Sequence, residues 1–286
     1  MELLSMKSFA KQMNNLTFTD YYYRLMLLAR SVFKWENLPD NIDERWIEKF
    51  LFVDGKCVIY DDPEKGLMVA KCNLVGDLNS YEEPRKVMPI GSDYRGDPLI
   101  VGEDCALIRN NDEMIPTSFF LKLFAYRLAE TSRTIDVNVN AQKTPVLVVG
   151  SEKQKLTLKN VYVQFTGNEP AIFGDKSLDT DMLTVLRTDA PIVFPQLQTQ
   201  KQDIWNECLT FLGINNANTE KRERLITDEV EANNTHIDLS ADCFLKTRED
   251  GAKIANSIFK KEITVSRRAQ KEVIECTQDT QLSSET

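Results

Sequence analysis

The hydrophobic pattern changes from a helical period to short β-rich runs at Lys56 and returns to a helical period near Thr117. In between, the runs KCVIYDD, GLMVAKC, RKVMPI, DPLIVG and CALIRN alternate with Asp-Pro, Gly and Asn turn signals. These short runs predict a small, strongly bent sheet or barrel. Because helical stretches lie on both sides of it, strands and helices are segregated, which favours an α+β fold.

Two helices are predicted before the β-rich region. Apolar residues recur every three or four positions from Asp20, the predicted cap, to about Glu36, and Pro39 ends this helix. Asp40 or Asn41 is predicted to cap a short second helix in IDERWIEKFLF.

Two long helices are predicted after it. The first begins at Thr117 or Ser118 and ends before Pro145, although its last residues also alternate as a strand would. The second begins near Pro191 or Pro195 and ends at Gly213, a plausible C-terminal cap. Between them lies a compact unit with a short helix, LKNVYVQF, and three strands, PVLVV, PAIFG and MLTVLRT.

The end of the chain is predicted to contain one more helix and one more strand. CFLKTREDGAKIANSIF has a helical pattern despite Gly251, and EITVSRR is typical of a strand. The tail TQDTQLSSET has the composition of a disordered terminus.

Composition sets limits on function. The 286 residues are 42% hydrophobic and can bury one sizeable core or two smaller ones. The six cysteines never take a metal-ligand spacing, so we expect reduced, mostly buried thiols in a cytosolic protein. We expect no signal peptide and no membrane span. A net charge of -9 argues against strong, sequence-independent binding to nucleic-acid phosphates over a large surface.

Motifs for catalysis are missing from the sequence. No phosphate-binding Walker motif occurs, and the single histidine, His236, has no catalytic or metal-binding context. Acidic groups such as Asp61 with Asp62 are interpreted as solvated turns, so no metal or cofactor is expected. The aromatic residues at 21–23, 33 and 35 could stack nucleic-acid bases, but their helical spacing favours core or subunit packing.

The segment NNANTEKRERLITDEVEANN, residues 215–234, is the least core-like part of the chain. It contains five acidic and three basic residues and follows an apolar helix. Composition alone allows a disordered, solvated loop. Loops this long are uncommon in compact domains, and many of them are functional.

Six motifs lead to a family resemblance. In chain order they are FKWENLP (33–39), NAQKTPVL (140–147), TDAP (188–191), WNECLTFLGINNAN (205–218), TDEV (227–230) and FLKTRE (244–249). Together they resemble the portal, or upper collar, proteins of small short-tailed phages with protein-primed replication.

The resemblance implies a portal fold, with long stem helices around a central tunnel, a small barrel-like wing and a mixed α/β clip. The implied parts are N-terminal helices 1–50, a β-rich wing 51–116, a stem helix 117–144, a clip 145–188, a stem helix 189–213, a tunnel loop 214–236 and a C-terminal wing segment 237–286.

The resemblance also implies a DNA-facing site. The tunnel-loop residues are Asn218, Glu220, Lys221, Arg222, Glu223, Arg224, Asp228 and Glu229. Arg187 corresponds to one basic tunnel position, whereas Gln196 stands at a second. A mixed and mildly acidic loop would keep contacts with DNA weak, so that DNA can slide.

The implied function is a non-enzymatic channel for packaging and ejecting double-stranded DNA. It would be a ring of about twelve copies at the portal vertex of the virion, assembled in the host cytoplasm. Its partners would be capsid protein, a separate packaging ATPase and tail or lower collar proteins. RNA binding is not expected, because the only bases in the first 20 residues are Lys7 and Lys11. The alternatives are another ring adaptor of the head-tail junction and an uncharacterised soluble enzyme.

Overall fold

The computed structural model describes residues 6–91, 94, 96–142, 146–148, 183–185, 191–215 and 227–268. Its backbone divides into two compact units, one formed by residues 1–130 with 201–286 and the other by residues 131–200. The predicted strand PAIFG, the predicted helix LKNVYVQF and the tail TQDTQLSSET lie outside the described residues.

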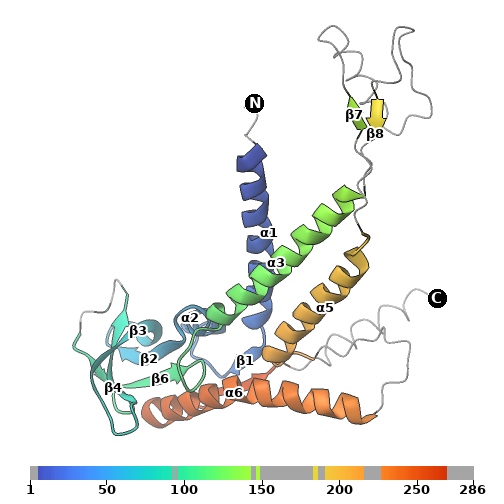
Figure 1. Cartoon of the computed structure of the whole chain (residues 1–286). Helices are drawn as coiled ribbons and strands as arrows, with labels where there is room; N and C mark the ends of the chain where they lie inside the picture. Colours follow the sequence, from blue (N-terminus) through green and yellow to red (C-terminus); the bar gives the residue numbers. More distant parts are fainter. Residues whose placement is uncertain are drawn as a thin grey trace, which may run out of the picture. The chain divides into compact units, whose positions relative to one another are not determined.

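Helices and strands are both present and largely segregated, which confirms the α+β class (Figure 1). The helices are α1 (Met6–Ala29), α2 (Glu44–Asp54), α3 (Thr117–Ala141), α5 (Phe194–Phe211) and α6 (Thr227–Phe259). The strands are β1 (Phe33–Glu36), β2 (Lys56–Asp62), β3 (Gly66–Leu78), β4 (Pro84–Ile90), β5 (Leu99–Ile100), β6 (Cys105–Arg109), β7 (Val146–Val148), β8 (Leu183–Val185) and β9 (Thr264–Arg267).

Five strands form the bent sheet predicted from the β-rich runs. Their order is β5-β4-β3-β2-β6, and every pair is antiparallel. The long strand β3 pairs with β2 through its first half and with β4 through its second half, where the register shifts between Val75 and Leu78. A tight turn joins the two edge strands, and in it the Gly102 N–H donates to the Cys105 carbonyl oxygen at 2.9 Å. The sheet therefore curls.

Strands β2 and β6 are buried on both faces, where successive side chains point to opposite sides. The inside of the curl encloses Val58, Tyr60, Cys72, Val87, Cys105 and Leu107. The outer face packs into the main core, to which it contributes Cys57, Ile59, Ala106 and Ile108. α6 also packs against this outer face (Figure 1).

Gly251 is the point at which α6 approaches β6. A Cβ atom at this position would lie 3.0 Å from Cγ1 and 3.1 Å from Cα of Ile108. Glycine weakens a helix interior by roughly 1 kcal/mol relative to alanine. Here it permits the close contact between helix and strand, which explains a glycine within a helical pattern.

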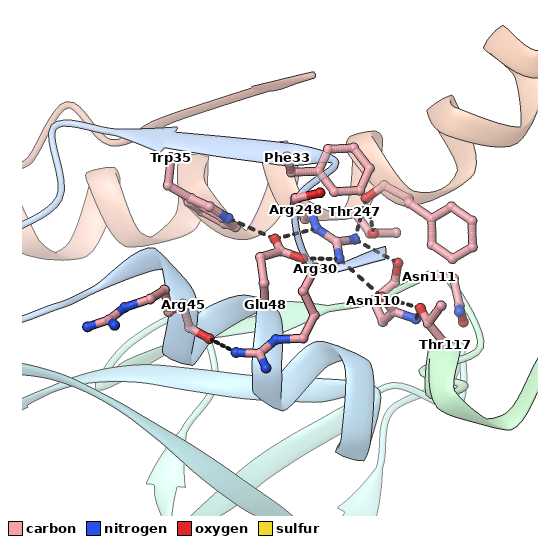
Figure 2. Close-up of polar contacts among 12 residues, drawn as sticks. Arg30, Phe33, Trp35, Arg45, Glu48, Asn110, Asn111, Thr117, Thr247 and Arg248 are labelled. Carbon is pink, nitrogen blue, oxygen red and sulfur yellow. Dashed lines mark hydrogen bonds and ion pairs between the residues drawn. The ribbon is translucent and has the colours of Figure 1, made fainter. Parts of the chain in front are cut away.

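Arg248 of α6 and Glu48 of α2 form a buried ion pair in the first unit (Figure 2). Each residue is only 3% exposed. Nε of Arg248 donates to Oε1 of Glu48 at 2.9 Å, and Nη2 donates to Oε2 at 2.8 Å. The two parallel bonds give the pair a fixed geometry.

The other donors of the Arg248 guanidinium are also satisfied. Nη1 donates to the carbonyl oxygens of Asn110 and Phe244 at 3.1 and 2.9 Å, and Nη2 donates to Oδ1 of Asn110 at 3.1 Å. All five N–H groups therefore have acceptors. The ring of Phe33 lies 4.3 Å from the guanidinium carbon, in cation-π contact.

This network joins five elements of the first unit. Nε1 of Trp35 in β1 donates to Oε1 of Glu48 at 2.9 Å. The amide nitrogen of Asn110, which follows β6, donates to Oγ1 of Thr117 at the start of α3 at 2.9 Å. We call Phe33, Trp35, Glu48, Asn110 and Arg248 the buried hub. It holds β1, α2, the end of β6, the start of α3 and α6 together.

A second apolar cluster in the same unit joins α1, α3 and α5. Its buried members are Leu25, Ala29, Phe52, Leu121, Ala125, Leu128, Ile204, Cys208 and Leu212. The α3 residues follow the three- and four-residue spacing that predicted this helix, so this part of the sequence prediction is confirmed.

Gly213 ends α5 in a Schellman motif, as the sequence predicted for its cap. Gly213 has φ 72°, its N–H donates to the Thr210 carbonyl oxygen at 3.0 Å, and the Ile214 N–H donates to the Leu209 carbonyl oxygen at 2.9 Å. The position is also crowded, because a Cβ atom would lie 2.5 Å from Cβ of Ala241. Glycine is therefore needed both for the turn and for the contact with α6.

The second unit contains a two-stranded sheet and the beginning of α5. β7 and β8 are antiparallel, with Val146 opposite Val185, and they confirm the strands predicted in PVLVV and MLTVLRT. Asn138 of α3 accepts from the Val193 N–H at 3.2 Å and donates to the Pro191 carbonyl oxygen at 2.9 Å. Pro195 is the second residue of α5, where its missing N–H costs nothing.

The prediction for the N-terminal helix was wrong at both ends. α1 begins at Met6 and ends at Ala29, and Asp20 lies in its interior, where it pairs with Arg24 at 2.9 Å. Phe33–Glu36 is strand β1, paired with β9. Its alternating buried and exposed residues form a period of two that is too short to stand out beside a helical pattern.

Two other helix starts differ from the prediction. Asp43 caps α2, because its carboxylate accepts from the Arg45 N–H at 2.8 Å, whereas Asp40 and Asn41 precede the cap. α6 begins at Thr227, so the C-terminal half of the loop expected at 214–236 is helical. α3 continues as a helix to Ala141 through the residues that alternate like a strand.

The hub leads to a stability prediction. Arg248→Met leaves the carboxylate of Glu48 buried without its cationic partner, with only the Trp35 Nε1–H still donating to it, so we expect a loss of about 3–5 kcal/mol in the free energy of unfolding. The double variant Arg248→Met/Glu48→Leu removes both charges and should lose less than the single variant. Urea unfolding followed by circular dichroism, at one protein concentration, measures both.

Lys253→Met is the matched control for Arg248→Met, because Lys253 forms an exposed pair with Asp250. It should change stability by less than about 1 kcal/mol. An Arg248→Met variant as stable as this control would contradict the role of the hub.

Substitutions at Gly213 and Gly66 separate the cost of backbone strain from the cost of side-chain crowding. Gly213→Ala should destabilise the protein by more than the roughly 1–2 kcal/mol of a left-handed non-glycine residue, because the new methyl group also meets Ala241. Gly66→Ala is the control, since Gly66 has φ 73° and a Cβ atom there would meet nothing within 4 Å. Equal losses for the two variants in urea unfolding would show that the contact with α6 is not tight.

Candidate functional site

Most of the residues expected to face DNA lie outside the described part of the chain. These are Asn218, Glu220, Lys221, Arg222, Glu223, Arg224 and Arg187. Asp228 and Glu229 lie in the first turn of α6, which begins at Thr227. Acidic residues suit this position, because the N-terminal end of a helix carries a partial positive charge.

The structure describes the two helices that border this segment and the contacts that hold them. α5 ends beside α6 at the contact between Gly213 and Ala241. Arg267 of β9 bridges them: its Nη1 lies 2.7 Å from Oδ1 of Asp238 on α6, and its Nη2 donates to the Gly213 carbonyl oxygen. We call Gly213, Asp238, Ala241 and Arg267 the loop anchor.

The loop anchor fixes the distance that the segment between the helices must cover. α6 runs 14 residues from Thr227 to Ala241, which corresponds to about 20 Å along a helix. The 12 residue steps from Asn215 to Thr227 can reach about 40 Å when extended. The segment is therefore about twice as long as a direct connection requires.

Four of the described cysteines pack in the core. Burial raises the pKa of Cys72, Cys105 and Cys208 to about 12, and it raises the pKa of Cys57 well above its ordinary value. These four side chains are free thiols in the core, whereas the Cys243 thiol is exposed. The four buried residues confirm the expected packing role, because a protonated, buried thiol is a poor nucleophile.

No group of three or more His, Cys, Asp or Glu side chains among the described residues could hold a metal ion. His236 is exposed on α6. Within the same residues, no helix combines the length and the apolar character that crossing a membrane would require.

The aromatic residues weighed for base stacking take different places. Phe33 and Trp35 are buried members of the hub, so packing is confirmed for them. The Tyr22 ring packs against Phe52, with centroids 6.3 Å apart. Tyr23 is exposed on α1.

Neither the buried hub nor the loop anchor was predicted from the sequence. Glu48 and Arg248 are 200 residues apart, and nothing in either local pattern identifies the partner. For α6, a signal was available: TDEV places a threonine before two acidic residues, a pattern typical of a helix start.

Comparison with solved structures shows a shared fold. The chain is similar to a chain of "Portal and tail of native bacteriophage P68", with a TM-score of 0.53 and 13% identity, over 100% of this chain and 99% of that one. A chain of "Virion of native gene transfer agent (GTA) particle" gives a TM-score of 0.49 and 10% identity, over 95% and 87%.

Comparison with protein families covers nearly the whole chain. The model described as Phage Connector (GP10) matches residues 4–273, from α1 past the last strand, β9. The match contains both the buried hub and the loop anchor. This chain therefore belongs to the phage connector family, the portal proteins that join head and tail at the portal vertex of the virion.

Proposed function

We propose that this connector forms a ring of about twelve copies that encloses a channel for double-stranded DNA. The observation that carries the proposal is the family match over residues 4–273, to which the portal-like fold adds support. DNA enters through the ring during packaging and leaves through it at ejection. The ring contacts capsid protein on one side and tail or lower collar proteins on the other.

The chain acts as a conduit, and the energy for packaging comes from a separate ATPase that docks on the ring. The sequence has no Walker motif to bind nucleotide phosphates. The described residues bring together no metal-binding cluster either. In this proposal α3 and α5 form the stem, the curled sheet with α6 forms the wing, and residues 145–188 form the clip.

The segment between α5 and α6 is the part of the channel that meets DNA. It can bow away from a connection of about 20 Å, because its chain is long enough for about 40 Å. Lys221, Arg222 and Arg224 make brief phosphate contacts, and Glu220 and Glu223 limit their strength. A strongly basic lining would release more counterions and hold DNA too firmly to slide.

The mass of the purified protein tests whether the ring forms. Native mass spectrometry of the purified full-length chain should give about twelve times its mass of 32.8 kDa, and negative-stain images should show a central hole. A ring that forms only after docking on another portal would identify a tail adaptor instead. A monomer or dimer that turns over a small molecule would favour an enzyme.

A shortened chain tests the role of the segment between α5 and α6. Deletion of residues 220–224 leaves seven residue steps between Asn215 and Thr227, about 23 Å when extended, which is enough for the connection of about 20 Å, so both helices stay intact. We expect the ring mass to stay unchanged and the amount of nuclease-protected DNA per particle to fall, because packaged DNA is no longer retained. A Gly-Ser replacement of equal length is the control that separates chain length from charge. Loss of the ring, or full retention of DNA, would contradict the assignment.

A further inference from the structure

α1 exposes an apolar stripe on its outer side. Leu16, Tyr23 and Leu27 lie at helical spacing and are between 54% and 64% exposed. At about 100° per residue, they lie about half a turn around the helix from Leu25, which is fully buried. We call these three residues the α1 stripe.

α3 exposes a second stripe in the same unit. Phe119, Leu123 and Tyr126 are between 59% and 67% exposed. They too lie about half a turn from the buried side of their helix, where Leu121 and Ala125 are fully buried. We call these three residues the α3 stripe.

The two stripes face away from one shared core. Leu25 of α1 and Leu121 of α3 belong to the same apolar cluster, so the opposite side of each helix points outward. α5 contributes to the same cluster, but its exposed residues in this unit are polar, among them Gln202, Asp203 and Glu207. Among α1, α3 and the part of α5 in this unit, only α1 and α3 therefore expose large apolar side chains.

We propose that the α1 stripe of one copy packs on the α3 stripe of the next copy, and that this contact, repeated, closes the connector ring. The inference rests on the proposed ring, in which every copy meets two neighbours through two different surfaces. Each stripe supplies three large apolar side chains. Exposed apolar side chains gathered on one side of a helix are suited to a surface that a partner covers.

Charged side chains lie beside both stripes and are compatible with contact between them. Asp20 lies between Leu16 and Tyr23 on α1, where it also pairs with Arg24. Lys122 is exposed next to Leu123 on α3. When unlike stripes pack, an acid of one copy meets a base of the other.

A mixing experiment with two variants of the full chain tests the proposal. The first variant, Leu16→Asp/Leu27→Asp, has a damaged α1 stripe and an intact α3 stripe. The second, Phe119→Asp/Leu123→Asp, has the reverse. Each alone should be a monomer by native mass spectrometry, because its intact stripe finds no partner. A 1:1 mixture should give dimers of one copy of each variant and no larger species.

Two controls accompany the mixture. Leu239→Asp on α6 is the matched control, because Leu239 is 64% exposed and belongs to neither stripe; it should form rings like the wild type. Far-UV circular dichroism and thermal unfolding of each variant show whether it is folded. All substituted side chains are exposed, so we expect the variants to keep their helices.

The outcomes separate the inference from the function on which it rests. A wild-type chain without rings overturns the proposed function. Wild-type rings together with rings of either variant overturn the inference alone. A single variant that forms dimers by itself shows contact between like stripes and also overturns it. The same is true if a variant loses thermal stability but keeps its ring mass, because another segment of the same chain then covers the stripe.

Discussion

The bidentate pair between Arg248 and Glu48 is the contact on which the first unit depends. A buried charge is tolerated only when its partners replace the lost water, and here every guanidinium N–H has an acceptor. The hydrogen-bond partners of Arg248 lie on α2, at the end of β6 and on α6 itself. All of these hydrogen bonds form only when the three elements are in place. Packing of the apolar core is not directional. The ion pair therefore adds specificity for one arrangement of these elements.

The arrangement of these elements determines which side chains the first unit exposes to its surroundings. With α6 held on β6 at Gly251 and on α5 at Gly213, the two ends of the charged segment start from fixed positions. The core between α1, α3 and α5 turns one side of each helix inward, and the outward sides then differ in chemistry. α1 and α3 present leucine and aromatic side chains, whereas α5 presents glutamine and acidic ones. The outward sides of α1 and α3 are thus suited to contact with another protein, whereas the outward side of α5 is suited to water.

Local patterns predicted much of this fold. The five strands of the curled sheet were found because each is a β-rich run between turn residues, and Gly213 was recognised as a helix cap from its residue type. β1 was missed because its partner, β9, lies more than 200 residues away. The hub was missed for the same reason. For the candidate site, the sequence located the charged segment but placed its second border inside α6, since acidic residues occur both in loops and in the first turns of helices.

The separation between Glu48 and Arg248 also has a consequence in time. At a synthesis rate of about 5–20 residues per second, the 200 residues between them take roughly 10–40 seconds to emerge. During this interval the residues of the curled sheet are synthesised, but the carboxylate of Glu48 still has no arginine. The hub is therefore complete only after Arg248 has been synthesised, late in the 286 residues, and a chain that ends before Arg248 leaves the Glu48 carboxylate without its arginine.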